Sequence, residues 1–110
     1  MNGDNKIRAV IQKIVHSLVA GYAPEKIILF GSYAYGQPDA DSDVDLLIIK
    51  RTKERFFKRL DTVRQVATGT HPHIPFEPIV LTPEEIERRL KSGDQFLSEV
   101  IQKGEVLYAA

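Results

Sequence analysis

The sequence predicts an α/β (α+β) fold in which helices pack on a small mixed β-sheet. Two long segments have apolar residues at helical spacing, a capping box opens a third helix, and three short apolar runs are typical of strands. The order of these six elements is helix, strand, strand, helix, strand, helix. With 110 residues the chain is long enough for one hydrophobic core, so we expect a single domain over residues 1–110.

The first half of the chain contains a helix and two strands. Apolar residues from 7 to 18 return to one helical face, which predicts an amphipathic helix with Asp4 or Asn5 near its cap and Gly21 near its end. Residues 26–30 and 44–49 are short apolar runs typical of buried strands. The second run contains an acid, which an apolar strand does not explain.

The second amphipathic helix is expected at residues 52–67, followed by a third strand at 76–81. Pro78 cannot donate a hydrogen bond to a sheet, so it favours an edge position for this strand. The other faces of the helix are basic and are expected to be solvated; they carry Lys53, Arg55, Lys58, Arg59 and Arg64.

A third helix should begin after Thr82, with Pro83 in its first turn and Glu85 completing a capping box. Its acids at 84, 85 and 87 each precede a base by four residues, so we expect ion pairs from Glu84 to Arg88, Glu85 to Arg89 and Glu87 to Lys91. A last helix at 95–103 and a strand at 105–108 follow. Their apolar residues form either core or a partner interface: Phe96, Leu97, Val100, Ile101, Val106, Leu107 and Tyr108.

Composition excludes several classes of function. Cysteine is absent, so disulfides, thiolate metal sites and cysteine nucleophiles are excluded. Fifteen basic and fifteen acidic residues give no net charge, which disfavours nonspecific binding to nucleic acid or to an anionic membrane. No apolar run has the length of a membrane span, and residues 1–8 do not have the pattern of a signal peptide. We therefore expect a cytoplasmic protein without a membrane segment.

The segment between the first two strands invites two familiar interpretations that fail. Gly31 and Gly36 have the spacing of a P-loop, but Gln37-Pro38 stands where that motif needs Lys and then Ser or Thr. The acids at 39, 41, 43 and 45 imitate a calcium-binding EF-hand loop. Val44 and Lys50 occupy the positions where that loop needs Gly and Glu.

Asp43 and Asp45 support a third interpretation. Side chains two apart on a strand point to the same face, about 6 to 7 Å apart along the backbone. Paired carboxylates suit a hard cation such as Mg²⁺, with water and substrate phosphates completing its coordination. Gly31 allows a tight turn after the first strand, and the amides that follow, with the Ser32 hydroxyl, are expected to open a helix that holds phosphate.

This segment resembles the signature of the nucleotidyltransferase superfamily related to DNA polymerase beta, and in so short a chain it is most similar to the minimal nucleotidyltransferases, the MNT antitoxins paired with HEPN-domain toxins. The residues that carry the resemblance are Gly31, Ser32, Gly36, Ser42, Asp43, Asp45 and Leu46. It implies that Gly31 and Ser32 contact the nucleotide's phosphates and that Asp43 and Asp45 ligate two Mg²⁺ ions. Members usually have a third carboxylate on a neighbouring strand, and Glu77 is the acid available there.

The resemblance further implies transfer of AMP from ATP to a hydroxyl, on a tyrosine of a HEPN-domain partner, with Glu77 as metal ligand and proton acceptor. We therefore expect the carboxylates of Asp43, Asp45 and Glu77 to converge within reach of one ion. A binding module that neutralises a partner without catalysis is the alternative, although it has no need of the Asp43 and Asp45 pair. An antibiotic- or RNA-modifying transferase is disfavoured. The sequence leaves open whether the chain forms an oligomer.

Overall fold

The computed structural model describes the backbone of residues 2–110 and the side chains from residue 6 onward. Along this part of the chain the elements are α1 (Asn2–Tyr22), β1 (Lys26–Phe30), α2 (Ser32–Tyr35), β2 (Val44–Ile49), α3 (Phe56–Val66), β3 (Phe76–Leu81), α4 (Pro83–Lys91), α5 (Gln95–Lys103) and β4 (Glu105–Ala109). The predicted alternation of helices and strands is confirmed.

The strands form one mixed sheet in the order β3-β2-β1-β4. The central strands β1 and β2 are antiparallel, β4 is antiparallel to β1, and β3 is parallel to β2. β3 lies at an edge, as Pro78 predicts, because an edge strand leaves one row of backbone groups without a partner.

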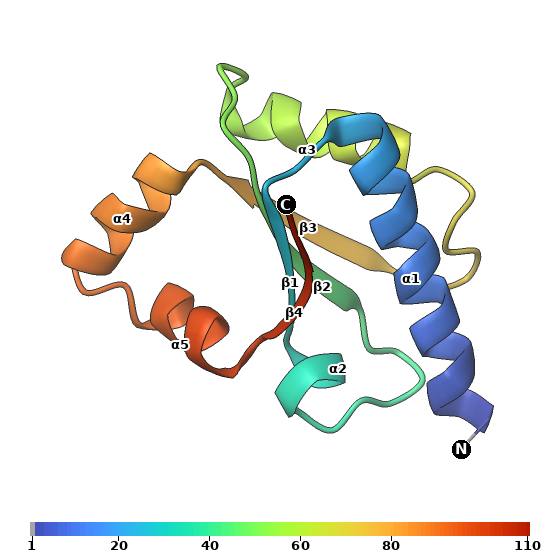
Figure 1. Ribbon diagram of the computed structural model, residues 1–110. Helices are drawn as coiled ribbons and strands as arrows, with labels where there is room; N and C mark the ends of the chain where they lie inside the picture. The colour runs from blue at the N-terminus through green and yellow to red at the C-terminus, as the bar shows by residue number, and fades with distance from the viewer. Residues whose placement is uncertain (1) are drawn as a thin grey trace.

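Helices cover both faces of the sheet: α1 and α3 lie on one side, and α4 and α5 lie on the other (Figure 1). Alternation along β2 divides its side chains between these layers. Leu46 and Ile48 enter the core beneath α1 and α3, whereas Leu47 packs in a smaller core with residues of α4 and α5. Asp45 is two positions from Leu47, so its carboxylate lies on the face that α4 and α5 cover.

Two predicted helix starts are wrong. α1 begins at Asn2, so Asp4 and Asn5 lie within the helix rather than at its cap. A polar residue before an apolar run need not be the cap, because a helix continues until its backbone is interrupted. α3 begins at Phe56 rather than at residue 52. Thr52 Oγ1 accepts a hydrogen bond from the amide of Glu54 (3.0 Å), a local bond that competes with helix formation.

The capping box of Thr82 and Glu85 is confirmed, but the expected ion pairs of α4 are only partly formed. Glu87 pairs with Lys91 (3.0 Å), whereas Glu84 pairs with Arg51 and Glu85 with Arg59. Arg59 is buried, at 6% exposure, and does not belong to a solvated basic face. Sequence spacing reveals partners within a helix, but not those that neighbouring elements bring close.

The C-terminal apolar residues divide between core and surface. Leu97 and Val100 are buried, whereas Phe96, Ile101 and Val106 are exposed. Among the described residues, no helix combines the length and the apolar character needed to cross a membrane.

Candidate functional site

The sheet register places three of the candidate residues side by side. Asp45 lies opposite Phe30 of β1 and opposite Glu77 of β3. Residues paired across strands point to the same face of a sheet, so Asp45, Phe30 and Glu77 share the face covered by α4 and α5. Asp43 lies immediately before β2, two residues from Asp45. The acids therefore gather where β1 ends and where β2 and β3 begin.

The Asp45 carboxylate is the electrostatic anomaly of the site. Partial burial, together with the smaller effects of the negative charges of Asp43 and Glu77, raises its pKa from the ordinary value to about 6. Within the described residues, no hydrogen bond or ion pair reaches this carboxylate. A half-buried anion with two anionic neighbours is therefore left without compensation by the protein itself.

Gly31 makes the backbone pass directly beside this carboxylate. Its φ of 73° lies in the left-handed region that favours glycine, and a Cβ at this position would collide with Asp45 Oδ2. The chain then enters α2, a helix of four residues in which the amides of Ala34 and Tyr35 donate to Gly31 O. The predicted helix after Gly31 is thus present but short, and it brings half-buried Ser32 next to the acids.

The loop between α2 and β2 is held by its own polar groups. Asp39 Oδ1 accepts from the amide of Asp41 (2.9 Å), and Ser42 Oγ accepts from the amide of Asp39 (2.8 Å). Tyr33 packs against the larger core and its hydroxyl donates to Ser42 O (3.4 Å). Asp39 and Ser42 thus stabilise the turn that precedes Asp43. Ser42, a residue of the sequence signature, therefore has a structural role.

Glu77 lies on the same face of the sheet as Asp45, but its carboxylate forms an ion pair with a guanidinium group. Arg64 of α3 reaches within 3.7 Å of Glu77 Oε2, and both side chains are about half exposed. No group of three His, Asp or Glu side chains within residues 6–110 is arranged to hold a metal ion. Asp43, Asp45 and Glu77 therefore share one region of the sheet without converging on one ion. The edge position of β3 explains this, because it leaves Glu77 exposed and within reach of Arg64.

The chemistry of the donor set nevertheless fits a divalent cation. Asp43 and Asp45 offer carboxylate oxygens, the ligands that Mg²⁺ prefers, and a bound cation would compensate the charge that raises the pKa of Asp45. The close approach of Gly31 leaves backbone rather than side chain next to these oxygens. Asp43 and Asp45 are therefore the residues that could hold a metal.

Two neighbours of the site were not singled out by the sequence. Arg64 meets Glu77 only because α3 packs along β3, and Phe96 of α5 contacts Phe30 edge to face at 5.6 Å. Both contacts join residues far apart in the chain, and neither has a local sequence signal.

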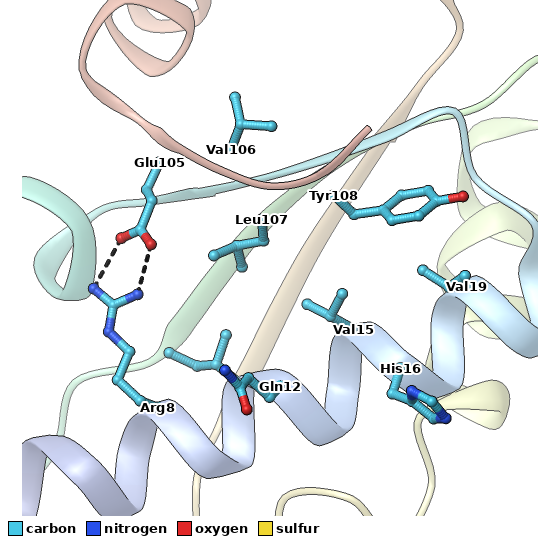
Figure 2. A pocket seen from close by; sticks show the side chains of 10 residues that line it. Arg8, Gln12, Val15, His16, Val19, Glu105, Val106, Leu107 and Tyr108 are labelled. Carbon is cyan, nitrogen blue, oxygen red and sulfur yellow. Dashed lines mark hydrogen bonds and ion pairs between the residues drawn. The ribbon is translucent and has the colours of Figure 1, made fainter. Parts of the chain in front are cut away.

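A separate groove lies away from the acids. It has a volume of about 550 Å³ and runs between α1 and β4. Figure 2 shows Leu107 and Val15 facing each other across it, with the ion pair of Arg8 and Glu105 (2.8 Å) at one end. This groove is on the α1 side of the sheet, whereas Asp45 and Glu77 are on the opposite side.

Comparison with known proteins agrees with this geometry. A family model described as nucleotidyltransferase domain matches residues 9–107. Among curated proteins, no relative matches the chain by sequence. One similar solved structure is a Sulfolobus solfataricus protein proposed to be a nucleotidyltransferase, with 22% identity, a TM-score of 0.63 and coverage of 94% of this chain and 82% of that chain. Another is a toxin-antitoxin with AMP-PNP, with 20% identity, a TM-score of 0.62 and coverage of 90% and 73%. At these identities the likeness shows the fold.

Proposed function

Because the chain belongs to the nucleotidyltransferase domain family, we propose that it transfers AMP from ATP to a hydroxyl group. One observation carries the proposal: the carboxylate of Asp45, with its pKa raised to about 6, is uncompensated beside Asp43 and against the backbone of Gly31. A site that only stabilised the fold would pair or remove such a charge. A site that binds a cation together with a triphosphate needs such an uncompensated negative charge to hold the cation.

Asp43 and Asp45 are proposed to hold two Mg²⁺ ions, with Glu77 as the third ligand. When bound, Mg²⁺ would supply positive charge that lowers the pKa of the attacking hydroxyl and stabilises the negative charge of the leaving pyrophosphate. Gly31 allows the Asp45 carboxylate to lie directly against the backbone, and the amide of Gly31 and the hydroxyl of Ser32 are proposed to contact the phosphates. Glu77 has to exchange Arg64 for the metal, and an exposed ion pair is weak enough to allow this.

The transfer forms one bond and breaks one bond. The acceptor oxygen attacks the α-phosphorus of ATP, and the bond from that phosphorus to the oxygen bridging to the β-phosphate breaks. AMP is then joined to the acceptor, and pyrophosphate leaves. Glu77 is proposed to accept the proton of the acceptor hydroxyl, since its exposed carboxylate is open to an incoming group.

The acceptor is proposed to be a tyrosine of a HEPN-domain toxin, which AMP transfer would neutralise. Support comes from the similar fold of a toxin-antitoxin with AMP-PNP. A partner protein would bring its own hydroxyl to the acids.

Incubation with α-labelled ATP, Mg²⁺ and the protein encoded by the neighbouring gene tests the proposal. We expect label on that protein, and we expect Asp43→Asn or Asp45→Asn to lower the rate roughly 10³-fold, because loss of metal binding removes several kcal/mol of transition-state stabilisation. Glu87→Gln is the matched control, since Glu87 is an exposed acid of α4 that pairs with Lys91.

Neutralisation of the toxin by the wild type and by both aspartate variants, without label on the toxin, would favour the alternative function of a binding module. Label that persists in both variants would show that another part of the chain performs the chemistry.

A further inference from the structure

Phe96, in the first turn of α5, is an exposed aromatic residue that packs on Phe30. Its side chain is 46% exposed, whereas Phe30, on which it stands, is only 7% exposed. The two rings meet edge to face, with centroids 5.6 Å apart and planes at 84°. Phe96 is therefore supported on one side by Phe30, and almost half of its surface is exposed and can contact a ligand.

Phe30 links this ring to the candidate site. It precedes Gly31 in the chain and lies directly opposite Asp45 in the β1–β2 ladder, on the same face of the sheet. Side chains directly opposed across antiparallel strands have Cβ atoms about 4.5 to 5.5 Å apart. The exposed ring of Phe96 is thus separated from the Asp45 side chain by one aromatic residue.

The framework beneath Phe96 fixes the position of its ring. Asp94 caps α5 by accepting from the amide of Leu97 (2.9 Å), and the side chain of Leu97 is buried against the sheet. At the other end of α5, a Cβ on Gly104 would collide with Val100 O and with the side chain of Ile28. Gly104 therefore allows α5 to lie tightly on β1, and Phe96 is presented by a preorganised element rather than by a loop.

We propose that the exposed face of Phe96 stacks on the nucleobase of the nucleotide whose phosphates lie at Gly31 and Asp45. This inference rests on the proposed function and extends it to the aromatic end of the substrate. A nucleoside triphosphate carries its charge at one end and its π-surface at the other, and this region of the sheet offers acids and backbone amides next to an open ring. Stacking on an aromatic side chain tolerates any base, so Phe96 contributes affinity rather than choice among bases.

Calorimetric titration with two probes, AMP-PNP and inorganic tripolyphosphate, each with Mg²⁺, separates the base from the phosphates. We expect Phe96→Ala to weaken AMP-PNP binding roughly tenfold and to leave tripolyphosphate binding unchanged. Phe96→Leu keeps an apolar contact on Phe30 without a π-face and should weaken AMP-PNP equally, whereas Phe96→Trp should restore binding. Phe57→Ala is the matched control, because Phe57 is a 77% exposed phenylalanine on α3, at the opposite face of the sheet.

The outcomes distinguish this inference from the proposed function. Wild-type affinity for AMP-PNP that is unchanged in both Phe96→Ala and Phe96→Leu would overturn stacking and leave nucleotide binding intact. Equal weakening of both probes would also overturn it, because the ring would then act on the phosphate site through the fold. Weakened binding of the partner protein alone would show that Phe96 contacts the acceptor instead. A wild type that binds neither probe would overturn both proposals.

Discussion

The pKa values of two partly buried carboxylates, Glu85 and Asp45, are shifted in opposite directions. Glu85 accepts two hydrogen bonds from the Arg59 guanidinium, at 2.7 and 3.2 Å, and one from the amide of Thr82. The bonds from Arg59 lower the pKa of Glu85 most, against the opposing effect of burial. Burial and two neighbouring anions raise the pKa of Asp45 to about 6. Burial is the largest cause of the shift at Asp45, whereas at Glu85 the bonds from Arg59 outweigh it, so the cationic partner sets the two carboxylates apart in addition to burial.

This contrast separates a negative charge that the fold pairs from one that the fold leaves without a cationic partner. Arg59 also donates to the carbonyls of Glu54 and Val80, so its pair with Glu85 joins α3, β3 and the start of α4. The donor and acceptor groups of this network all belong to the chain itself, so it needs no external ligand. Asp45 lacks such a partner among the described residues, which is what a carboxylate reserved for an external cation requires.

Removal of the guanidinium should make Glu85 resemble Asp45. Arg59→Met leaves a partly buried carboxylate without its cation, and we expect a loss of about 2 to 3 kcal/mol, at the low end for a buried pair because Glu85 is partly exposed. This corresponds to a decrease of roughly 10 °C in Tm, measurable by calorimetry. The double variant Arg59→Met/Glu85→Gln should recover part of the loss. A double variant less stable than Arg59→Met would mean that the charge of Glu85 is not the source of the cost.

Neutralising Asp45 should change the stability in the opposite direction and make the protein more stable. Without metal at pH 7, Asp45→Asn removes a repelled anion, and we expect a gain of about 1 kcal/mol, reduced from the full pKa shift because the side chain is partly solvated. Tm should rise by about 5 °C while AMP transfer is lost. A lower Tm would show that the carboxylate contributes to folding and would remove the contrast with Glu85.

The sequence predicts features of the fold that depend on neighbouring residues, but not contacts between residues far apart in the chain. Residues 26–30, 44–49 and 76–81 are strands as predicted, because short apolar runs and Pro78 are local signals. The capping box that holds Glu85 is also local. The partner that lowers the pKa of Glu85 is not, since Arg59 reaches it from 26 positions away in the chain.

In the candidate site, too, the residues of one chain segment could be predicted from the sequence, whereas a contact between separate elements could not. Asp43, Asp45, Gly31 and Ser32 lie within one segment of the chain, and the resemblance of that segment identifies them together. Glu77 faces the same region of the sheet by its register with Asp45, but its contact with Arg64 depends on how α3 packs along β3. No pattern in the sequence indicates that contact.

A pH series should sharpen the difference between Asp45→Asn and the wild type. The raised pKa of Asp45 contributes stability that is present below about pH 4 and is lost as the pH rises through about 6. The gain in Tm of Asp45→Asn should therefore be near zero at pH 4 and should reach its full size of about 5 °C at pH 7. Glu85, whose lowered pKa acts in the opposite direction, is present in both proteins and cancels in the comparison. A gain that is equal at all pH values would point to packing rather than charge.

Glu77 should show the smallest effect on folding, because its pair with Arg64 is about half exposed on both sides. Glu77→Gln is expected to change stability by less than about 0.5 kcal/mol in a denaturant titration, the range of most surface substitutions. Because Glu77→Gln should hardly change stability, a loss of AMP transfer in this variant would support the proposed roles of Glu77 in metal binding and proton transfer. Arg64→Gln provides the complementary test: release of Glu77 from its cation should leave stability unchanged and should not lower the affinity for Mn²⁺. If Arg64→Gln weakened that affinity, Arg64 would be holding Glu77 in place for the metal rather than competing with it.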